Sequence, residues 1–212
     1  MRAQFQPVNT NDDTSFFVYS IHLKSGSSAA TRANETDIIR SDANALSDGK
    51  SIIYLGDFNI LSSSEGTRTN MSVVGNGQAF DVVDSPGQWR DNTAFSKLHT
   101  QNPGAAMDDR FDLMFVTEEM LDGTGIDYIA NSYRVFGNNG THALNSTVDS
   151  GTGATSAVLT ALANAGDHLP MVADFTVPES SALFLLVLTA SGLSMTRSYR
   201  QADYGQHQQQ QP

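Results

Sequence analysis

Residues Ile52–Ile60, with the sequence IIYLGDFNI, join a short apolar run directly to polar side chains. The apolar part, IIYL, is typical of a strand buried on both faces, and Gly56 is expected to end it. Asp57 and Asn59 follow two positions apart. An extended backbone therefore directs both toward the same side and turns Phe58 into the core. A carboxylate and a carboxamide at a strand end fit a bound cation or phosphate, or else an ordinary turn.

The residues before this strand predict a parallel pair. Ser15–Leu23 is rich in β-branched and aromatic residues, which favours a central strand. Ala30–Leu46 carries a sparse apolar stripe and is expected to be a helix. A strand, a helix and the strand at Ile52–Leu55 form a β-α-β unit, whose two strands are expected to be parallel. The sequence therefore predicts an α/β fold.

The rest of the chain supplies two further strong strands, at Arg110–Thr117 and Leu169–Val177, and an Ala-rich helix at Ala154–Ala165. The weaker candidates are a short helix within Leu61–Gly77, short strands at Ala79–Val83 and Asn92–Lys97, a helical turn at Glu118–Leu121 and a strand at Ile126–Phe136.

Composition limits the class of protein. The 212 residues, 39% of them hydrophobic, permit one globular domain with a tail. Without cysteine, a disulfide scaffold and a thiolate metal site are excluded. A formal charge of −11 argues against broad attraction to nucleic acid, although a divalent cation can still join carboxylates to a substrate phosphate. Residues 1–13 hold no apolar stretch of the kind found in a signal peptide.

Polar clusters stand at the ends of the four strongest strands. They are His22 with Lys24, Asp57 with Asn59, Arg110 with Asp112, and Asp167 with His168. In open α/β folds the functional groups gather at strand ends and in the loops that follow. Turn chemistry alone does not account for the same pattern at four separate strand ends.

These clusters lie in the motifs HLKS, GDFN, RFD and GDHLP, in that order. Together they resemble the endonuclease/exonuclease/phosphatase superfamily, the fold of deoxyribonuclease-I-like nucleases, sphingomyelinases and inositol polyphosphate phosphatases. The resemblance covers Ser15 to Val177 and implies a four-layer α/β sandwich of the deoxyribonuclease-I-like type, of which this chain holds half or more. It also implies hydrolysis of a phosphoester with Mg²⁺, or Mn²⁺, as the cofactor. Nucleic acid, a phospholipid headgroup and a sugar phosphate are the substrate classes expected.

The resemblance assigns roles only where residues match. His168 is expected to be the catalytic base, oriented by Asp167, or to stabilise the pentacovalent phosphorane. A histidine beside a carboxylate suits the activation of water. Asp57 and Asn59 are expected to position the water and the phosphate, and Asp57 and Asp167 to share a metal. His22 is expected to contact the phosphate or to protonate the leaving group, and Asp112 to support a histidine or the metal. Arg110 is expected to form ion pairs with acids of the site or to bind substrate. Lys24 is expected to bind substrate. An exposed lysine with no role remains an equal alternative for Lys24.

One departure from the family pattern concerns the metal. In the family, the first half of the domain carries an Asn at a strand end and a Gln-Glu pair, whose Glu is the principal metal ligand. Neither precedes His22. A truncated gene model, a split gene and a half-domain that needs a partner would each explain this. A different function also stays open, namely a non-catalytic, membrane-sorted surface protein with a relic half-domain.

The C-terminal part differs in kind from the rest. The expected divisions are a connection at 1–14, the domain at 15–177, an apolar segment at 178–200 and a disordered Gln-rich tail at 201–212. Residues 180–195 are uncharged but, at 16 residues, shorter than the roughly 20 needed to cross a bilayer. With Val177-Pro178-Glu179 before them and Arg197 and Arg200 after them, they resemble a PEP-CTERM sorting tail. That resemblance implies export and membrane contact, while a buried or membrane-peripheral helix is the alternative.

Five other residues invite a functional interpretation. His99 and His142 lie in polar stretches and are expected to be solvated. Asp108 and Asp109 are expected to face solvent, with an auxiliary role for Asp109 beside a cation as the alternative. Trp89 is expected in the core, unless it stacks on a base.

Overall fold

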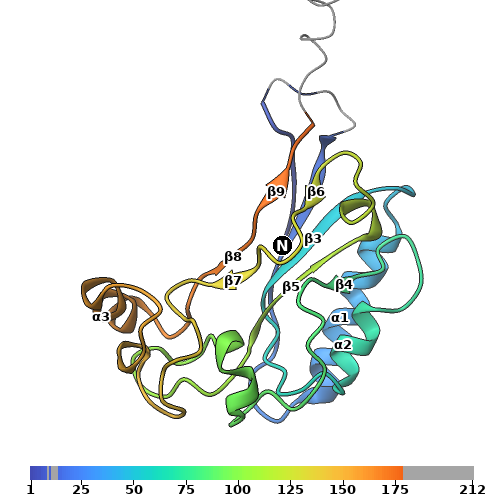
Figure 1. The fold of residues 1–212 in the computed structure, drawn as a ribbon. Helices are drawn as coiled ribbons and strands as arrows, with labels where there is room; N and C mark the ends of the chain where they lie inside the picture. The colour runs from blue at the N-terminus through green and yellow to red at the C-terminus, as the bar shows by residue number, and fades with distance from the viewer. Residues whose placement is uncertain (9, 11–13, 179–212) are drawn as a thin grey trace, which may run out of the picture.

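A computed structural model describes residues 1–8, 10 and 14–178 of the chain. A five-stranded mixed sheet forms its centre, in the order β1-β2-β3-β5-β4 (Figure 1). The strands are β1 (Arg2–Phe5), β2 (Phe16–His22), β3 (Ser51–Asp57), β4 (Phe80–Asp81) and β5 (Asp112–Val116). The expected sorting segment and Gln-rich tail lie outside the described residues.

The central strand order follows from the predicted β-α-β unit. Helix α1 (Ala29–Asn44) connects β2 to β3, and the two strands are parallel, as expected. Strand β5 pairs with the other edge of β3 in the antiparallel sense. The α/β fold class is therefore confirmed.

Helices and short strands surround this sheet. The other helices are α2 (Gly66–Met71), α3 (Ser156–Ala165) and the 3-10 turns η2 (Thr93–Leu98), η3 (Glu118–Met120) and η4 (Val148–Ser150). The two-residue strands are β6 (Asp127–Tyr128), which pairs with β9 (Phe175–Thr176), and β7 (Arg134–Val135), which pairs with β8 (Met171–Val172). None of the helices among the described residues has the length and apolarity to cross a membrane.

Three stretches differ from expectation. The prediction of a strand at Asn92–Lys97 is wrong. The Asn92 side chain accepts a hydrogen bond from the Ala94 N–H and begins the 3-10 turn η2 there instead. The strands expected at Ile126–Phe136 and Leu169–Val177 each consist of two short pieces. Strand β1 lies in the stretch expected to be a connection, and it pairs antiparallel with β2.

The central strands alternate their side chains between two cores. One face packs against α1 and α2, which lie together on one side of the sheet in Figure 1. Its buried strand residues are Tyr19, Ile21, Ile52, Tyr54, Leu113 and Phe115. The opposite face contributes Ile53, Met114 and Val116 and, half-buried, Phe16, Val18 and Leu55. Because the period along a strand is two residues, His22, Asp57 and Asp112 fall on this second face.

Candidate functional site

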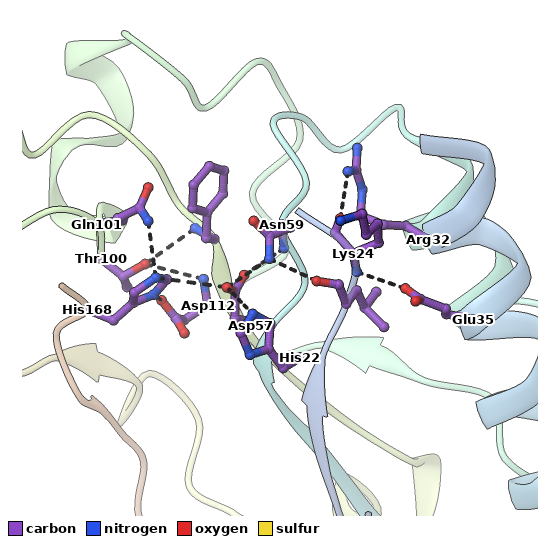
Figure 2. Close-up of polar contacts among 12 residues, drawn as sticks. His22, Lys24, Arg32, Glu35, Asp57, Asn59, Thr100, Gln101, Asp112 and His168 are labelled. Atoms are coloured by element: carbon purple, nitrogen blue, oxygen red, sulfur yellow. Dashed lines mark hydrogen bonds and ion pairs between the residues drawn. The ribbon is translucent and has the colours of Figure 1, made fainter. Parts of the chain in front are cut away.

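The register of the sheet places three of the expected site residues in one row. His22 at the end of β2 lies opposite Asp57 at the end of β3, and Asp57 lies opposite Asp112 at the start of β5. Directly opposed residues on neighbouring strands have their side chains about 5 Å apart. A parallel pair and an antiparallel pair thus gather one histidine and two carboxylates at a single sheet edge (Figure 2).

Gly56 allows β3 to reach Asp57 in this register. The strand continues through the glycine, so the expectation that Gly56 ends it is wrong. Its φ is +132°, and a Cβ atom there would lie 2.0 Å from the carbonyl oxygen of Ile21 on β2. Only glycine tolerates both the backbone angle and this close approach. The residue next to Asp57 therefore keeps the two strands together at the site.

Asn59 holds the carboxylate of Asp57 in place. Its backbone N–H donates to Asp57 Oδ1 at 2.8 Å, and its side-chain Nδ2 donates to Asp57 Oδ2 at 2.8 Å. The same Nδ2 donates to the carbonyl of Leu23 at 3.0 Å. Both N–H groups of the carboxamide are therefore used within the protein, which leaves its oxygen as the group that can meet a water. Phe58 between them is fully buried, as expected.

His168 is oriented by Asp112. The Nδ1 atom of His168 lies 2.6 Å from Asp112 Oδ2, and its Nε2 atom lies 3.9 Å from Asp57 Oδ2 (Figure 2). The hydrogen bond to Asp112 raises the pKa of His168 above its usual value, against the opposing effect of burial. His168 thus lies between two carboxylates, with one ring nitrogen fixed and the other directed toward β3.

The expectation that Asp167 orients His168 is wrong. Asp167 is exposed, and among the described residues no hydrogen bond or ion pair joins it to another member of the site. The chain bends at Asp167, directly before the isolated bridge at His168. Asp112, which was expected to support a histidine or a metal, makes that contact instead.

His22 and Lys24 form the exposed side of the site. The His22 side chain is 78% exposed, with Nε2 3.5 Å from Asp57 Oδ2. The Lys24 side chain is exposed, while its backbone N–H donates to Glu35 and its carbonyl accepts from Arg32 (Figure 2). Arg32 is itself buried and paired with Glu65 at 2.6 Å. The backbone after β2 is therefore fixed, and the His22 and Lys24 side chains stay accessible to a substrate.

Two site residues were missed from the sequence. The hydroxyl oxygen of Thr100 accepts the backbone N–H groups of Phe111 and Asp112, at 3.3 and 3.2 Å. The next residue, Gln101, directs its side-chain Nε2 to Nε2 of His168 at 3.2 Å. No motif marks either residue, because their positions depend on isolated backbone bridges of Gln101 with Asp109 and with His168.

Arg110 does not ion-pair with the acids of the site. It is fully buried and donates from both terminal nitrogens to Asp81, at 2.9 and 3.1 Å. Its guanidinium also lies 4.7 Å from the ring centroid of Trp89, which is in the core as expected. Along an extended segment, Arg110 and Asp112 would share a face, but β5 begins only at Asp112. The expected role in substrate binding is therefore wrong, since a fully buried side chain is out of reach of a substrate.

Three residues expected in solvent are buried. His99 is fully buried and His142 nearly so, with their ring centroids 5.6 Å apart. Asp109 is 5% exposed, and burial followed by the charge of Asp108 raises the pKa of Asp109 to about 6. Polar neighbours in the sequence did not reveal this burial, because the loops of this chain fold over one another.

The described residues do not complete a metal site. Among them, no group of three or more His, Asp or Glu side chains is placed to hold a metal ion. Asp57 offers a carboxylate, but its oxygens already accept hydrogen bonds from Asn59. Burial raises the pKa of Asp57 above its usual value. The expected sharing of Mg²⁺ by Asp57 and Asp167 thus has no geometric support in the described part of the chain.

Comparisons with known proteins add little detail. No family model and no curated protein matches the chain. Among solved structures it is similar to a functionally unknown conserved protein from Enterococcus faecalis, at 15% identity and a TM-score of 0.49, over 84% of this chain and 55% of that one. It is also similar to D. rerio TDP2 complexed with single strand DNA product, at 14% identity and a TM-score of 0.47, over 79% of this chain and 59% of that one.

A third similar structure is a mannosyl-6-phosphatase from Bacteroides thetaiotaomicron, at 12% identity and a TM-score of 0.42. It is matched over 76% of this chain and 51% of its own length. The chain thus spans little more than half the length of the solved structures that it matches.

Proposed function

We propose that this chain carries the site of a phosphoester hydrolase in which His168 activates the attacking water. The observation that carries the proposal is the arrangement of His168, whose Nδ1 is bound by Asp112 at 2.6 Å while Nε2 faces the row formed by β2, β3 and β5. A carboxylate that holds one imidazole nitrogen leaves the other as a directed base. The motifs that resemble the endonuclease/exonuclease/phosphatase superfamily agree with this chemistry.

In the proposed reaction, water attacks phosphorus and gives its proton to His168 Nε2. The bond between phosphorus and the leaving oxygen breaks, and that oxygen takes a proton from His22 or from solvent. Asp57, held by Asn59, accepts a hydrogen bond that orients the water, and Lys24 lies beside the phosphate. Because little covalent work falls to the protein in such a reaction, positioning accounts for most of the catalysis.

Export and membrane sorting through residues 180–195 remain predictions, as does the identity of the substrate. The exposed His22 and Lys24 side chains fit any phosphoester, whether in nucleic acid, a phospholipid headgroup or a sugar phosphate. Among the described residues no group of three or more His, Asp or Glu side chains is placed to hold Mg²⁺ or Mn²⁺, so the proposed steps use only side chains of this chain.

The test compares His168→Ala and Asp112→Asn with the unaltered full chain on bis(p-nitrophenyl) phosphate and p-nitrophenyl phosphate. Mg²⁺ is present throughout, with Mn²⁺ in a parallel series, so that a cation from solution is not limiting. Loss of the base should lower kcat roughly 100-fold or more, the usual contribution of general base catalysis. Asp149→Asn in η4 is the matched control. Turnover by His168→Ala equal to that of the unaltered chain would contradict the proposal.

A further inference from the structure

Gln101 occupies the nitrogen of His168 that is to act as the base. Its side-chain Nε2 lies 3.2 Å from His168 Nε2, while Asp112 Oδ2 lies 2.6 Å from His168 Nδ1 (Figure 2). Both ring nitrogens therefore have a polar partner in the substrate-free chain. One partner is a carboxylate and the other is a carboxamide.

The chemistry of the two partners decides where the imidazole carries its proton. A carboxylate only accepts hydrogen bonds, so the atom facing Asp112, Nδ1, carries the hydrogen. The neutral ring then has its lone pair on Nε2. The amide nitrogen of Gln101 is a donor, and it therefore donates to that lone pair. Nε2 is thus unprotonated and directed away from Asp112.

The backbone fixes Gln101 in front of His168. Gln101 forms isolated bridges with Asp109 on one side and with His168 on the other. Beside it, the Thr100 carbonyl accepts from Leu169 at 2.9 Å. Residues 100 and 101 therefore lie in extended pairing between the residues just before β5 and the segment that carries His168. Within the described part of the chain, the Gln101 carboxamide makes no other hydrogen bond.

A competing partner stands close to the same nitrogen. Asp57 Oδ2 is 3.9 Å from His168 Nε2. A carboxylate opposite Nε2 favours a proton on that atom, and a protonated Nε2 has no lone pair to offer to water. A donor at the same place has the opposite effect. The donor of Gln101 therefore acts together with Asp112 to keep the proton on Nδ1 and the lone pair on Nε2, against the opposite effect of Asp57.

We propose that Gln101 is a positioning residue that keeps the lone pair of His168 Nε2 directed at the place of the attacking water, and that it yields this place when substrate binds. The proposal rests on the proposed function of His168 as the base. The Gln101 nitrogen marks the position of the water, since its distance of 3.2 Å is that of a hydrogen-bonded donor.

The first experiment reads the imidazole of His168 without substrate. ¹⁵N NMR of the full chain is recorded about two pH units above the ordinary histidine pKa. We expect one protonated nitrogen, Nδ1, and one unprotonated nitrogen, Nε2. In Gln101→Glu the new acceptor should move the Nε2 signal toward the position of a protonated nitrogen. In Gln101→Met the Nε2 signal should lie between those of the unaltered chain and Gln101→Glu. Gln78→Met, at the far end of the sheet, is the matched control and should leave both signals in place.

The second experiment measures hydrolysis by the same variants. Gln101→Glu should lower kcat/KM roughly tenfold, because the contact acts before substrate binds and the new carboxylate favours a proton on Nε2, where the base needs a lone pair. Gln101→Met should lower kcat/KM by a smaller factor than Gln101→Glu does. An Nε2 signal that is the same in Gln101→Glu as in the unaltered chain would overturn the proposal, and so would an unchanged kcat/KM. Absence of turnover in the unaltered chain would count against the proposed function alone, because the NMR experiment needs no substrate.

Discussion

The hydrogen bond between His168 and Asp112 joins an imidazole to a carboxylate at 2.6 Å. Such a bond favours the charged form of the histidine, and it raises the pKa of His168. The raised pKa stabilises the folded chain below the unfolded histidine pKa. That contribution is lost as the pH rises through the folded pKa. Function has the opposite requirement, because a base must be unprotonated to accept a proton from water.

The pH dependence of hydrolysis is therefore a test of this bond. We expect kcat to rise with pH through the His168 pKa, with the midpoint above the ordinary value of about 6.5. Asp112→Asn removes the charge that raises the pKa, so the midpoint should move to lower pH while the plateau falls. Asp149→Asn should leave the midpoint unchanged. A midpoint unmoved by Asp112→Asn would show that another group controls the profile.

Individual residues differ in how far the sequence predicted them. His22, Asp57 and Asp112 were expected together because each ends or begins a strong strand, and the register confirms that they are neighbours. Arg110 and Asp167 belong to the same motifs but project elsewhere. A motif gives the identity of a side chain, whereas its direction depends on the residue at which the strand begins or ends.

At the scale of elements, the end of β3 depends on a backbone contact that no other residue type permits. Gly56 has a φ of +132°, and its Cα faces the Ile21 carbonyl of β2 so closely that a Cβ would lie 2.0 Å from the oxygen. Gly26 also has a positive φ, +77°, but a Cβ atom there would meet no atom of the described residues within 4 Å. Substitution of Gly26 therefore measures the destabilisation caused by the backbone angle alone, whereas substitution of Gly56 adds the destabilisation caused by a steric clash.

Gly56→Ala should lower the free energy of unfolding by at least about 3 kcal/mol, because strain and displacement of β2 act together. Gly26→Ala should cost only about 1 kcal/mol, the usual penalty of a left-handed angle. Urea unfolding of both variants measures the difference. Equal losses for the two variants would mean that the approach of β2 to β3 has little energetic importance.

Strong elements and weak elements were predicted unequally for a physical reason. Strands β2, β3 and β5 and helix α1 carry their own apolar pattern, so they were expected near their observed bounds. The pairs β6–β9 and β7–β8 have two residues in each strand. Such strands exist because a distant segment supplies hydrogen bonds, and that information is absent from the local sequence. The same holds for Gln101, which is placed by two isolated bridges.

At the scale of the whole molecule, a buried ion pair connects segments on either side of the site. Arg110, just before β5, binds Asp81 of β4 with both partners almost completely buried. The Arg110 guanidinium also contacts Trp89 in the connection between β4 and β5. A second cation, Arg68, lies 3.8 Å from Asp81. The pair thus joins the edge of the sheet to the loop that leads to Thr100 and Gln101.

Removing one partner of this pair should therefore destabilise the whole fold. Arg110→Met leaves the Asp81 carboxylate buried without its bidentate partner, for which a loss of roughly 3–5 kcal/mol is expected. That is a large part of the roughly 5–15 kcal/mol that holds a typical domain together. The double variant Arg110→Met with Asp81→Leu has no buried carboxylate at position 81, and Arg68 keeps its ion pair with Asp84 at 3.3 Å. More than half of the lost stability should therefore return. Denaturant unfolding of the two variants decides the matter. If the double variant is no more stable than Arg110→Met, the loss of stability comes from the lost contact with Trp89 and not from the unpaired Asp81 carboxylate.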